Sequence, residues 1–157
     1  MSSIVFKSAK QHAIAIQKRS IKAIDLLEAY FEQIDKFNPE INAVIWQDRK
    51  AAKEIARQID KETATGNFRG PLHGVPMTVK ESFNLSGAPT TWGDPKNIHN
   101  IATTDSDAVA RLRSAGAIVF GKTNVPLDLV EWQTFNKIYG TTNNPWDQTR
   151  TPGGSSG

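Results

Sequence analysis

The chain has 157 residues, of which 38% are apolar and 22% charged, as is typical of a soluble globular domain large enough to bury a core. It contains no cysteine, which excludes a disulfide framework and a thiol nucleophile. No apolar run approaches the roughly 18 residues of a membrane span. The N-terminus lacks the apolar stretch of about 7–15 residues found in signal peptides. We therefore expect a cytoplasmic protein that does not bind membranes.

The net charge of +3 does not by itself indicate a nucleic-acid partner. The densest basic group, Lys18, Arg19 and Lys22, lies in a helical pattern that also carries Asp25 and Glu28. A stripe of Lys and Arg with interleaved aromatic residues, which is typical of nucleic-acid binding, is missing from the sequence. The pattern predicts a solvated surface of mixed charge and no nucleic-acid partner.

The first half of the chain is mostly helical in its apolar spacing. Helices are expected over residues 8–19, 20–37 and 48–63, because apolar residues recur there at steps of three and four. Ser20 is expected to cap the second helix, and Pro39 to end it, because the residue before a proline is disfavoured in helical conformation. The β-branched run over 41–46 predicts a short strand.

The second half alternates buried strands with polar loops. Residues 75–79 predict a buried strand, 81–100 an irregular segment and 105–115 a helix that ends at Gly116. A second buried strand follows over 117–120, and a short helix is expected over 128–134. Everything after Tyr139 has the composition of a loop. A helix followed closely by a buried strand is half of an α/β crossover, so the sequence predicts an α/β fold in one unit.

Lys80 ends the first buried strand, after Val75, Met77 and Val79. Burial disfavours the charged form of a lysine and lowers its pKa, so a lysine in this place can serve as a general base. The alternative is a solvent-facing lysine hydrogen-bonded to Glu81. Spacing alone favours that alternative.

Ser155 follows Gly153 and Gly154, and glycines permit backbone turns that aim a side chain at a neighbour. A Gly/Ser-rich stretch is also the usual composition of a flexible linker. Taken together, a buried lysine and a serine on a glycine-rich turn are two parts of a serine–lysine hydrolase.

Both segments resemble the amidase signature family. The likeness is densest over 70–93, 103–126 and 139–157 and includes Thr151-Pro152-Gly153-Gly154-Ser155-Ser156-Gly157. It implies the N-terminal part of the amidase signature fold, a mixed sheet flanked by helices that is incomplete in this chain. Residues 1–157 are then the first portion of a single amidase domain.

The resemblance also implies roles for individual residues. Lys80 corresponds to the base, and Ser155 to a relay serine after a cis peptide bond. The nucleophilic serine is expected a couple of dozen residues further on, beyond Gly157. Leu129 to Trp132 falls where family members line the acyl pocket, so Leu129 and Ser155 are the candidate substrate contacts.

The implied activity is hydrolysis of a small-molecule amide through an acyl-enzyme, with a Ser-cisSer-Lys triad and no cofactor. The chain alone is expected to be inactive, and a homodimer of the complete protein is left open. Two alternatives remain: a truncated, non-catalytic fragment, and the amidase subunit of a tRNA-dependent amidotransferase. The segments 90–93 and 130–136 are more similar to free-standing amidases.

Other candidate groups are assigned structural roles. His73 lies in a loop, and His12 and His99 have no partner at metal-ligand spacing, so no metal is expected. Gly121-Lys122-Thr123-Asn124 lacks the full phosphate-loop pattern. Trp146 is expected to pack under the Gly/Ser turn.

The Gly/Ser turn is expected to be mobile in this chain, because terminal residues rich in glycine and serine are poorly ordered by default. Without the nucleophile segment over it, the bond between Gly154 and Ser155 is expected to be mostly trans. Ser155 is then expected to lie out of contact with Lys80.

Overall fold

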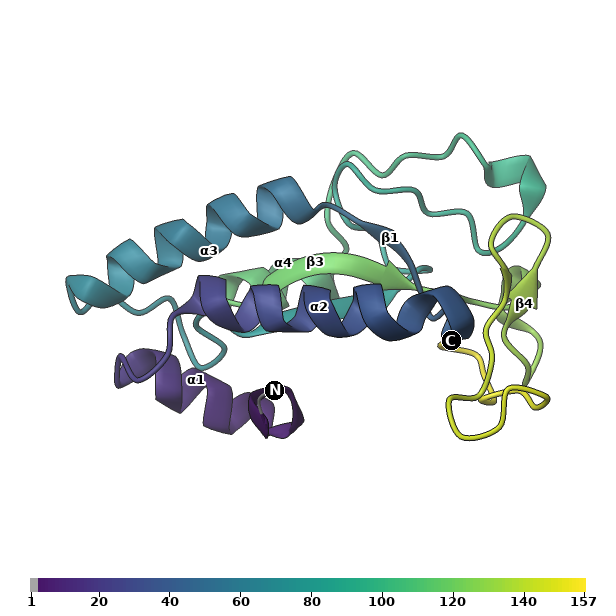
Figure 1. Cartoon of the computed structure of the whole chain (residues 1–157). Coiled ribbons are helices and arrows are strands. Elements are labelled where there is room, and N and C mark those ends of the chain that lie inside the picture. The colour runs from purple at the N-terminus through teal and green to yellow at the C-terminus, as the bar shows by residue number, and fades with distance from the viewer. Residues whose placement is uncertain (1–2) are drawn as a thin grey trace. The chain divides into compact units, whose positions relative to one another are not determined.

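The structure is a computed structural model that describes residues 3–157 (Figure 1). Its helices are α1 (Ala9–Gln17), α2 (Ala23–Ile41), α3 (Arg49–Ala64) and α4 (Asp107–Ser114). A three-stranded sheet has the order β1 (Val44–Gln47), β3 (Ile118–Thr123), β2 (Pro76–Lys80), and a two-stranded sheet pairs β4 (Phe135–Asn136) with β5 (Gly140–Thr141). Three short 3-10 turns, η1 (Ser3–Phe6), η2 (Pro95–Asn97) and η3 (Leu127–Leu129), complete the elements. The predicted α/β class is confirmed.

Contacts divide the chain into two compact units that alternate along the sequence. Unit 1 comprises the described residues up to Gln33, Asp48–Met77 and Ala110–Phe120, and unit 2 comprises Ile34–Gln47, Thr78–Val109 and Gly121–Gly157. The elements α2, β2, α4 and β3 each run from one unit into the other. The prediction of a single amidase domain over 1–157 stays a prediction.

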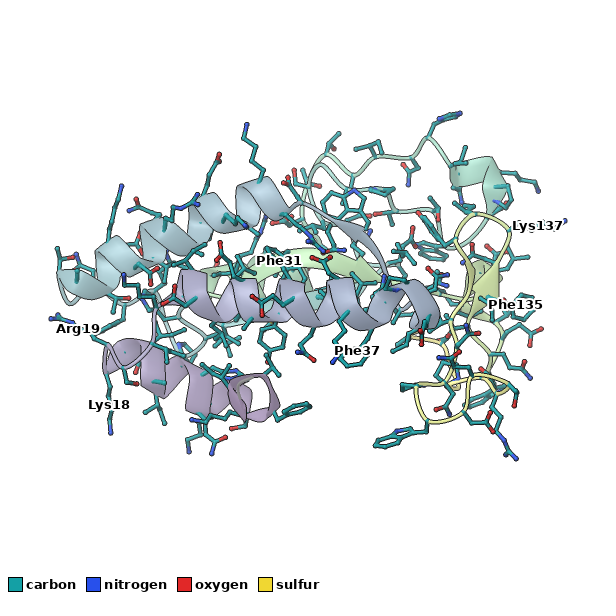
Figure 2. The ribbon with its side chains drawn as sticks, viewed as in Figure 1. Lys18, Arg19, Phe31, Phe37, Phe135 and Lys137 are labelled. Carbon is teal, nitrogen blue, oxygen red and sulfur yellow. The ribbon has the colours of Figure 1, made fainter. Side chains whose placement is uncertain are left out.

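Unit 1 buries apolar faces of α1, α2 and α3 around Gly74. This glycine has φ of +78°, and a Cβ there would lie 2.9 Å from Ile16 Cδ1 and 3.1 Å from Ala23 Cβ. Only a residue without a side chain allows such an approach at positive φ. Phe31 lies on α2 (Figure 2). Its ring packs edge-on against Phe120 with centroids 5.2 Å apart, and the Arg49 guanidinium lies 4.7 Å from its centroid.

Two helix boundaries differ from those predicted. Helix α2 begins at Ala23, and its first amides donate to the Asp60 carboxylate of α3, to Oδ1 from Ala23 at 2.7 Å and to Oδ2 from Ile24 at 3.2 Å. The Ser20 hydroxyl donates instead to the Ala15 carbonyl at 3.0 Å. The prediction that Ser20 caps this helix is therefore wrong, because a carboxylate from another helix takes that role.

Helix α2 also continues past Pro39 to Ile41, so the predicted stop at the proline is wrong. The helix ends where Asn42 adopts φ of +54°. Asn38 Oδ1 accepts hydrogen bonds from the Ala43 and Val44 amides at 2.9 and 2.8 Å, which stabilises the exit into β1. These contacts hold the last turn of the helix in spite of the proline.

In unit 2, β1 and β3 pair antiparallel, with Val44 opposite Thr123, Trp46 opposite Lys122 and Gln47 opposite Gly121. The helix predicted over 128–134 is wrong. Only η3 forms there, because Asp128 and Leu129 have φ of +49° and +64°, outside the helical region. Sequence patterns also missed the short β4–β5 pair, whose strands have two residues each.

Within residues 3–157, the helices are too short or too polar to cross a lipid bilayer.

Candidate active site

Lys80 lies at the last position of β2, where the chain leaves the sheet. The next residue, Glu81, is fully buried, and its amide donates to the Thr123 carbonyl at 3.0 Å. The Glu81 carboxylate accepts hydrogen bonds from the Thr91 hydroxyl at 2.8 Å and the Trp92 amide at 3.0 Å. The carboxylate is thus bonded to the loop over 91–92, and this fixes the strand end that carries Lys80.

The structure brings Lys80 and Ser155 together although 75 positions separate them. Lys80 Nζ donates a hydrogen bond to Ser155 Oγ at 2.6 Å. Burial lowers the pKa of Lys80 from its ordinary value, because desolvation disfavours the ammonium form. A lysine in this environment is closer to releasing its proton than an exposed one.

The expectation for the Gly/Ser turn is wrong in two respects. The bond between Gly154 and Ser155 is cis, and Ser155 is in hydrogen-bond contact with Lys80. The reason is that residues 123–134 already hold the turn. The Thr134 hydroxyl donates to the Gly153 carbonyl at 3.0 Å and accepts from the Gly157 amide at 3.1 Å.

Gly154 lies directly against the backbone of Trp132. A Cβ on Gly154 would come within 2.8 Å of the Trp132 carbonyl carbon and 2.9 Å of its oxygen. Real Cβ atoms do not approach backbone so closely, so a side chain at this position would displace the turn. The glycine of the motif is required by this close approach, and no pattern in the sequence indicates which segment approaches.

Leu129 and Ser155 line one shallow cleft of about 220 Å³, together with Val130, Glu131, Trp132 and Gly154. Leu129 therefore lines the same cleft as Ser155, the partner of Lys80. The positive φ of Asp128 and Leu129 turns the chain so that this stretch meets the turn.

A second cleft in unit 2 is larger, about 450 Å³, and lies apart from these residues. Phe135 and Lys137, both labelled in Figure 2, belong to its lining. Its complete lining consists of Gly93, Asp94, Pro95, Lys96, Leu127, Phe135, Asn136 and Lys137. Lys80, Ser155 and Leu129 are absent from this set.

Trp146 does not pack under the turn as predicted, because its side chain is 94% exposed. Its amide donates to Asn144 Oδ1 at 2.9 Å, in a tight turn closed by a bridge between Asn144 and Asp147. This turn directs the indole outward. Composition could not reveal the direction of a side chain at the tip of a turn.

His73 has the structural role predicted for it. It is fully buried, its Nδ1 accepts from the Arg69 amide at 3.1 Å, and its Nε2 therefore donates to the Thr63 hydroxyl at 2.8 Å. Burial lowers its pKa, so the ring is neutral. Among residues 3–157 there is no group of three or more His, Cys, Asp or Glu side chains arranged to hold a metal ion.

Lys122 is a fully buried lysine, and its burial was not predicted from the sequence. Its side chain is 0% exposed, and Nζ donates to the Pro89 carbonyl and, at 2.9 Å, to the Thr90 hydroxyl. Desolvation lowers its pKa to about 8, and the nearby Glu81 carboxylate opposes that shift. The neighbouring Thr123 hydroxyl donates to the Ser156 carbonyl at 3.1 Å, so β3 supports the turn directly.

Known proteins are similar to this chain over almost its whole length. The family profile described as Amidase matches residues 25–157. An indoleacetamide hydrolase of Bradyrhizobium diazoefficiens is 42% identical over 96% of this chain and 29% of its own length. A glutamyl-tRNA(Gln) amidotransferase subunit of Acidothermus cellulolyticus is 36% identical over 100% of this chain and 31% of its own.

A solved fatty acid amide hydrolase superposes with a TM-score of 0.93 at 25% identity, covering 98% of this chain and 27% of that one. The chain thus spans less than a third of the length of these proteins. The profile match extends over all three segments that carry the resemblance. The chain belongs to the amidase signature family.

Proposed function

We propose that the protein is an amidase that hydrolyses the C–N bond of a small carboxamide through an acyl-enzyme. The observation that carries the proposal is the 2.6 Å hydrogen bond between Lys80 Nζ and Ser155 Oγ. Family membership supports amide hydrolysis as the reaction class. The cleft beside Ser155 supports a small substrate.

In the proposed mechanism, Lys80 is neutral in the resting enzyme and acts as general base. Its amine takes a proton from the Ser155 hydroxyl, which takes one from a nucleophilic serine beyond Gly157. The nucleophile oxygen bonds to the amide carbon, and the returned proton leaves on the departing amine. In the second step, a water molecule loses a proton through Ser155 to Lys80, and its oxygen bonds to the acyl carbon. The ester bond to the nucleophilic serine then breaks, and that serine regains its proton. Residues 1–157 on their own are proposed to be inactive.

Substitution of Lys80 in the complete protein tests this assignment. Lys80→Ala and Lys80→Arg should each lower kcat/KM for simple amides, including indole-3-acetamide, by on the order of 10²–10⁴, as for loss of a general base. Arginine fails because a guanidinium stays protonated. Lys50→Ala, at an exposed lysine on α3, should keep wild-type activity. Near-normal activity of Lys80→Arg would show that Lys80 is not the base.

A second candidate is the amidase subunit of a tRNA-dependent amidotransferase, favoured by the 36% identity to such a subunit over the whole chain. The two candidates differ in the fate of the released ammonia. A free-standing amidase releases ammonia or amine from simple amides without partner subunits. An amidotransferase subunit delivers ammonia to a glutamyl-tRNA only when assembled. Measuring both reactions with the complete protein separates them.

A further inference from the structure

Thr134 contacts both ends of the turn that carries Ser155. Its side chain is buried, with 1% exposed. The hydroxyl donates to the Gly153 carbonyl at 3.0 Å and accepts from the Gly157 amide at 3.1 Å. Because a hydroxyl is a donor and an acceptor at once, one side chain closes residues 153–157 into a ring.

Thr134 is itself anchored by its neighbours. Its carbonyl accepts from the Thr142 amide at 3.0 Å, and the next residues form β4, which pairs with β5. The Asn136 side-chain amide donates to Asn124 Oδ1 at 2.8 Å and to the Val125 carbonyl at 2.7 Å. The hydroxyl therefore acts from a position that several hydrogen bonds fix.

Two further contacts reach the turn from residues 123–132, and each touches a single residue of it. The Thr123 hydroxyl donates to the Ser156 carbonyl, and the Trp132 backbone lies against Gly154. Neither contact ties residue 153 to residue 157. The Thr134 hydroxyl does so, and Ser155 lies at the centre of the segment that it closes.

We propose that Thr134 is a positioning residue: its hydroxyl holds the turn in the form that keeps Ser155 Oγ within hydrogen-bond reach of Lys80 Nζ. The catalytic part of this inference rests on the proposed function, in which Lys80 and Ser155 move the proton. A merely stabilising Thr134 would change the melting temperature and leave the environment of Lys80 unaltered.

The first experiment needs no amide turnover. In the 157-residue chain with isotope-labelled lysine, NMR titration of the Lys80 side chain compares wild type with Thr134→Val, which keeps the shape and removes the hydroxyl, and with Thr134→Ser, which restores it. The Thr134→Val change should move the pKa of Lys80 up toward its ordinary value, because the loosened turn admits water. Thr134→Ser should titrate as wild type.

Thr141→Val is the matched control, on the exposed strand β5. Across the part of the chain that the structure describes, its hydroxyl makes no hydrogen bond, so Lys80 should titrate unchanged. If valine prevents folding, Thr134→Ala removes the same hydroxyl with less bulk. A Lys80 titration unchanged in a folded variant without the hydroxyl would overturn the proposal.

The second experiment uses the complete protein. Thr134→Val should lower kcat by on the order of 10- to 100-fold with KM nearly unchanged, as for loss of two hydrogen bonds that orient a reacting group. Thr134→Ser should recover most of that rate. Equal losses in the serine and valine variants, or an effect on KM alone, would overturn the positioning role. If the complete protein hydrolyses no amide, the amidase proposal fails, and the titration still decides the structural claim.

Discussion

Lys122 combines complete burial with a charge that its surroundings only partly satisfy. Nζ has donor bonds to Pro89 and Thr90, and the Glu81 carboxylate lies near enough to favour the ammonium form. Desolvation still prevails and lowers the pKa to about 8. In the unfolded chain the same lysine has its ordinary value of about 10.4.

This difference predicts how stability depends on pH. Between the folded and unfolded pKa values, the unfolded chain binds more protons, so the free energy of unfolding rises with pH. From about pH 7 to about pH 9.5 the contribution of Lys122 should be about 2 kcal/mol. Urea unfolding at both pH values measures it, with wild type compared with Lys122→Met, which cannot titrate.

In Lys122→Met, the free energy of unfolding should rise less with pH, because the contribution of Lys122 is removed. Lys10→Met, at an exposed lysine on α1, should show the same rise as wild type. An equal rise in wild type and Lys122→Met would show that Lys122 does not titrate in this range.

Sequence analysis proposed Lys80, Ser155 and Leu129 from their resemblance to the family's motifs, and their roles stay predictions. It missed Thr134, Glu81 and Lys122, whose roles depend on partners 10 to 33 positions away. Contacts between residues so far apart produce no periodic pattern in the sequence. The available signal for a buried Lys122 was its place one glycine after the apolar run Ile118–Phe120.

At the scale of elements, long amphipathic helices were predicted well. Helices α1 and α3 agree with the predicted ranges to within two residues. Their N-caps are Ser8 and Asp48, whose side chains accept from the Gln11 and Ala51 amides. Local capping is readable because donor and acceptor lie three residues apart. The start of α2 was missed because its cap, Asp60, lies 37 positions further on.

Asp60 therefore gives a test of that cap. Its carboxylate accepts from two amides at the positive end of the α2 dipole, so Asp60→Ala should lower the free energy of unfolding by about 2 kcal/mol. Asp60→Asn should lose less, since the amide oxygen still accepts. Chemical denaturation of the three proteins checks the order, and Lys61→Ala serves as the neighbouring control. An unchanged free energy of unfolding in Asp60→Ala would mean that the cap adds nothing to stability.

At the scale of the whole molecule, the turn around Ser155 is held by contacts with Lys80, Thr123 and Thr134, which lie far from it in the sequence. The sequence could not predict this, because the segments that hold the turn have no regular pattern of their own. A preformed Lys80–Ser155 pair is nevertheless distinct from a working enzyme, which also needs a nucleophile.

The purified 157-residue chain should therefore show no amide turnover above that of its Lys80→Ala variant. The assay follows ammonia release from simple amides at high protein concentration. Circular dichroism of both proteins controls for folding. Turnover by the chain that disappears in the Lys80→Ala variant would mean that a nucleophile lies within residues 1–157.

The alternation of the two units along the sequence has a consequence for fragmentation. Each unit is assembled from three separate stretches, and α2, β2, α4 and β3 each belong to both. A protease that cuts once in the loop between α3 and β2 therefore leaves two pieces that each contain parts of both units. Neither unit corresponds to one continuous stretch of gene, so neither can be expressed by itself as a single segment of this chain.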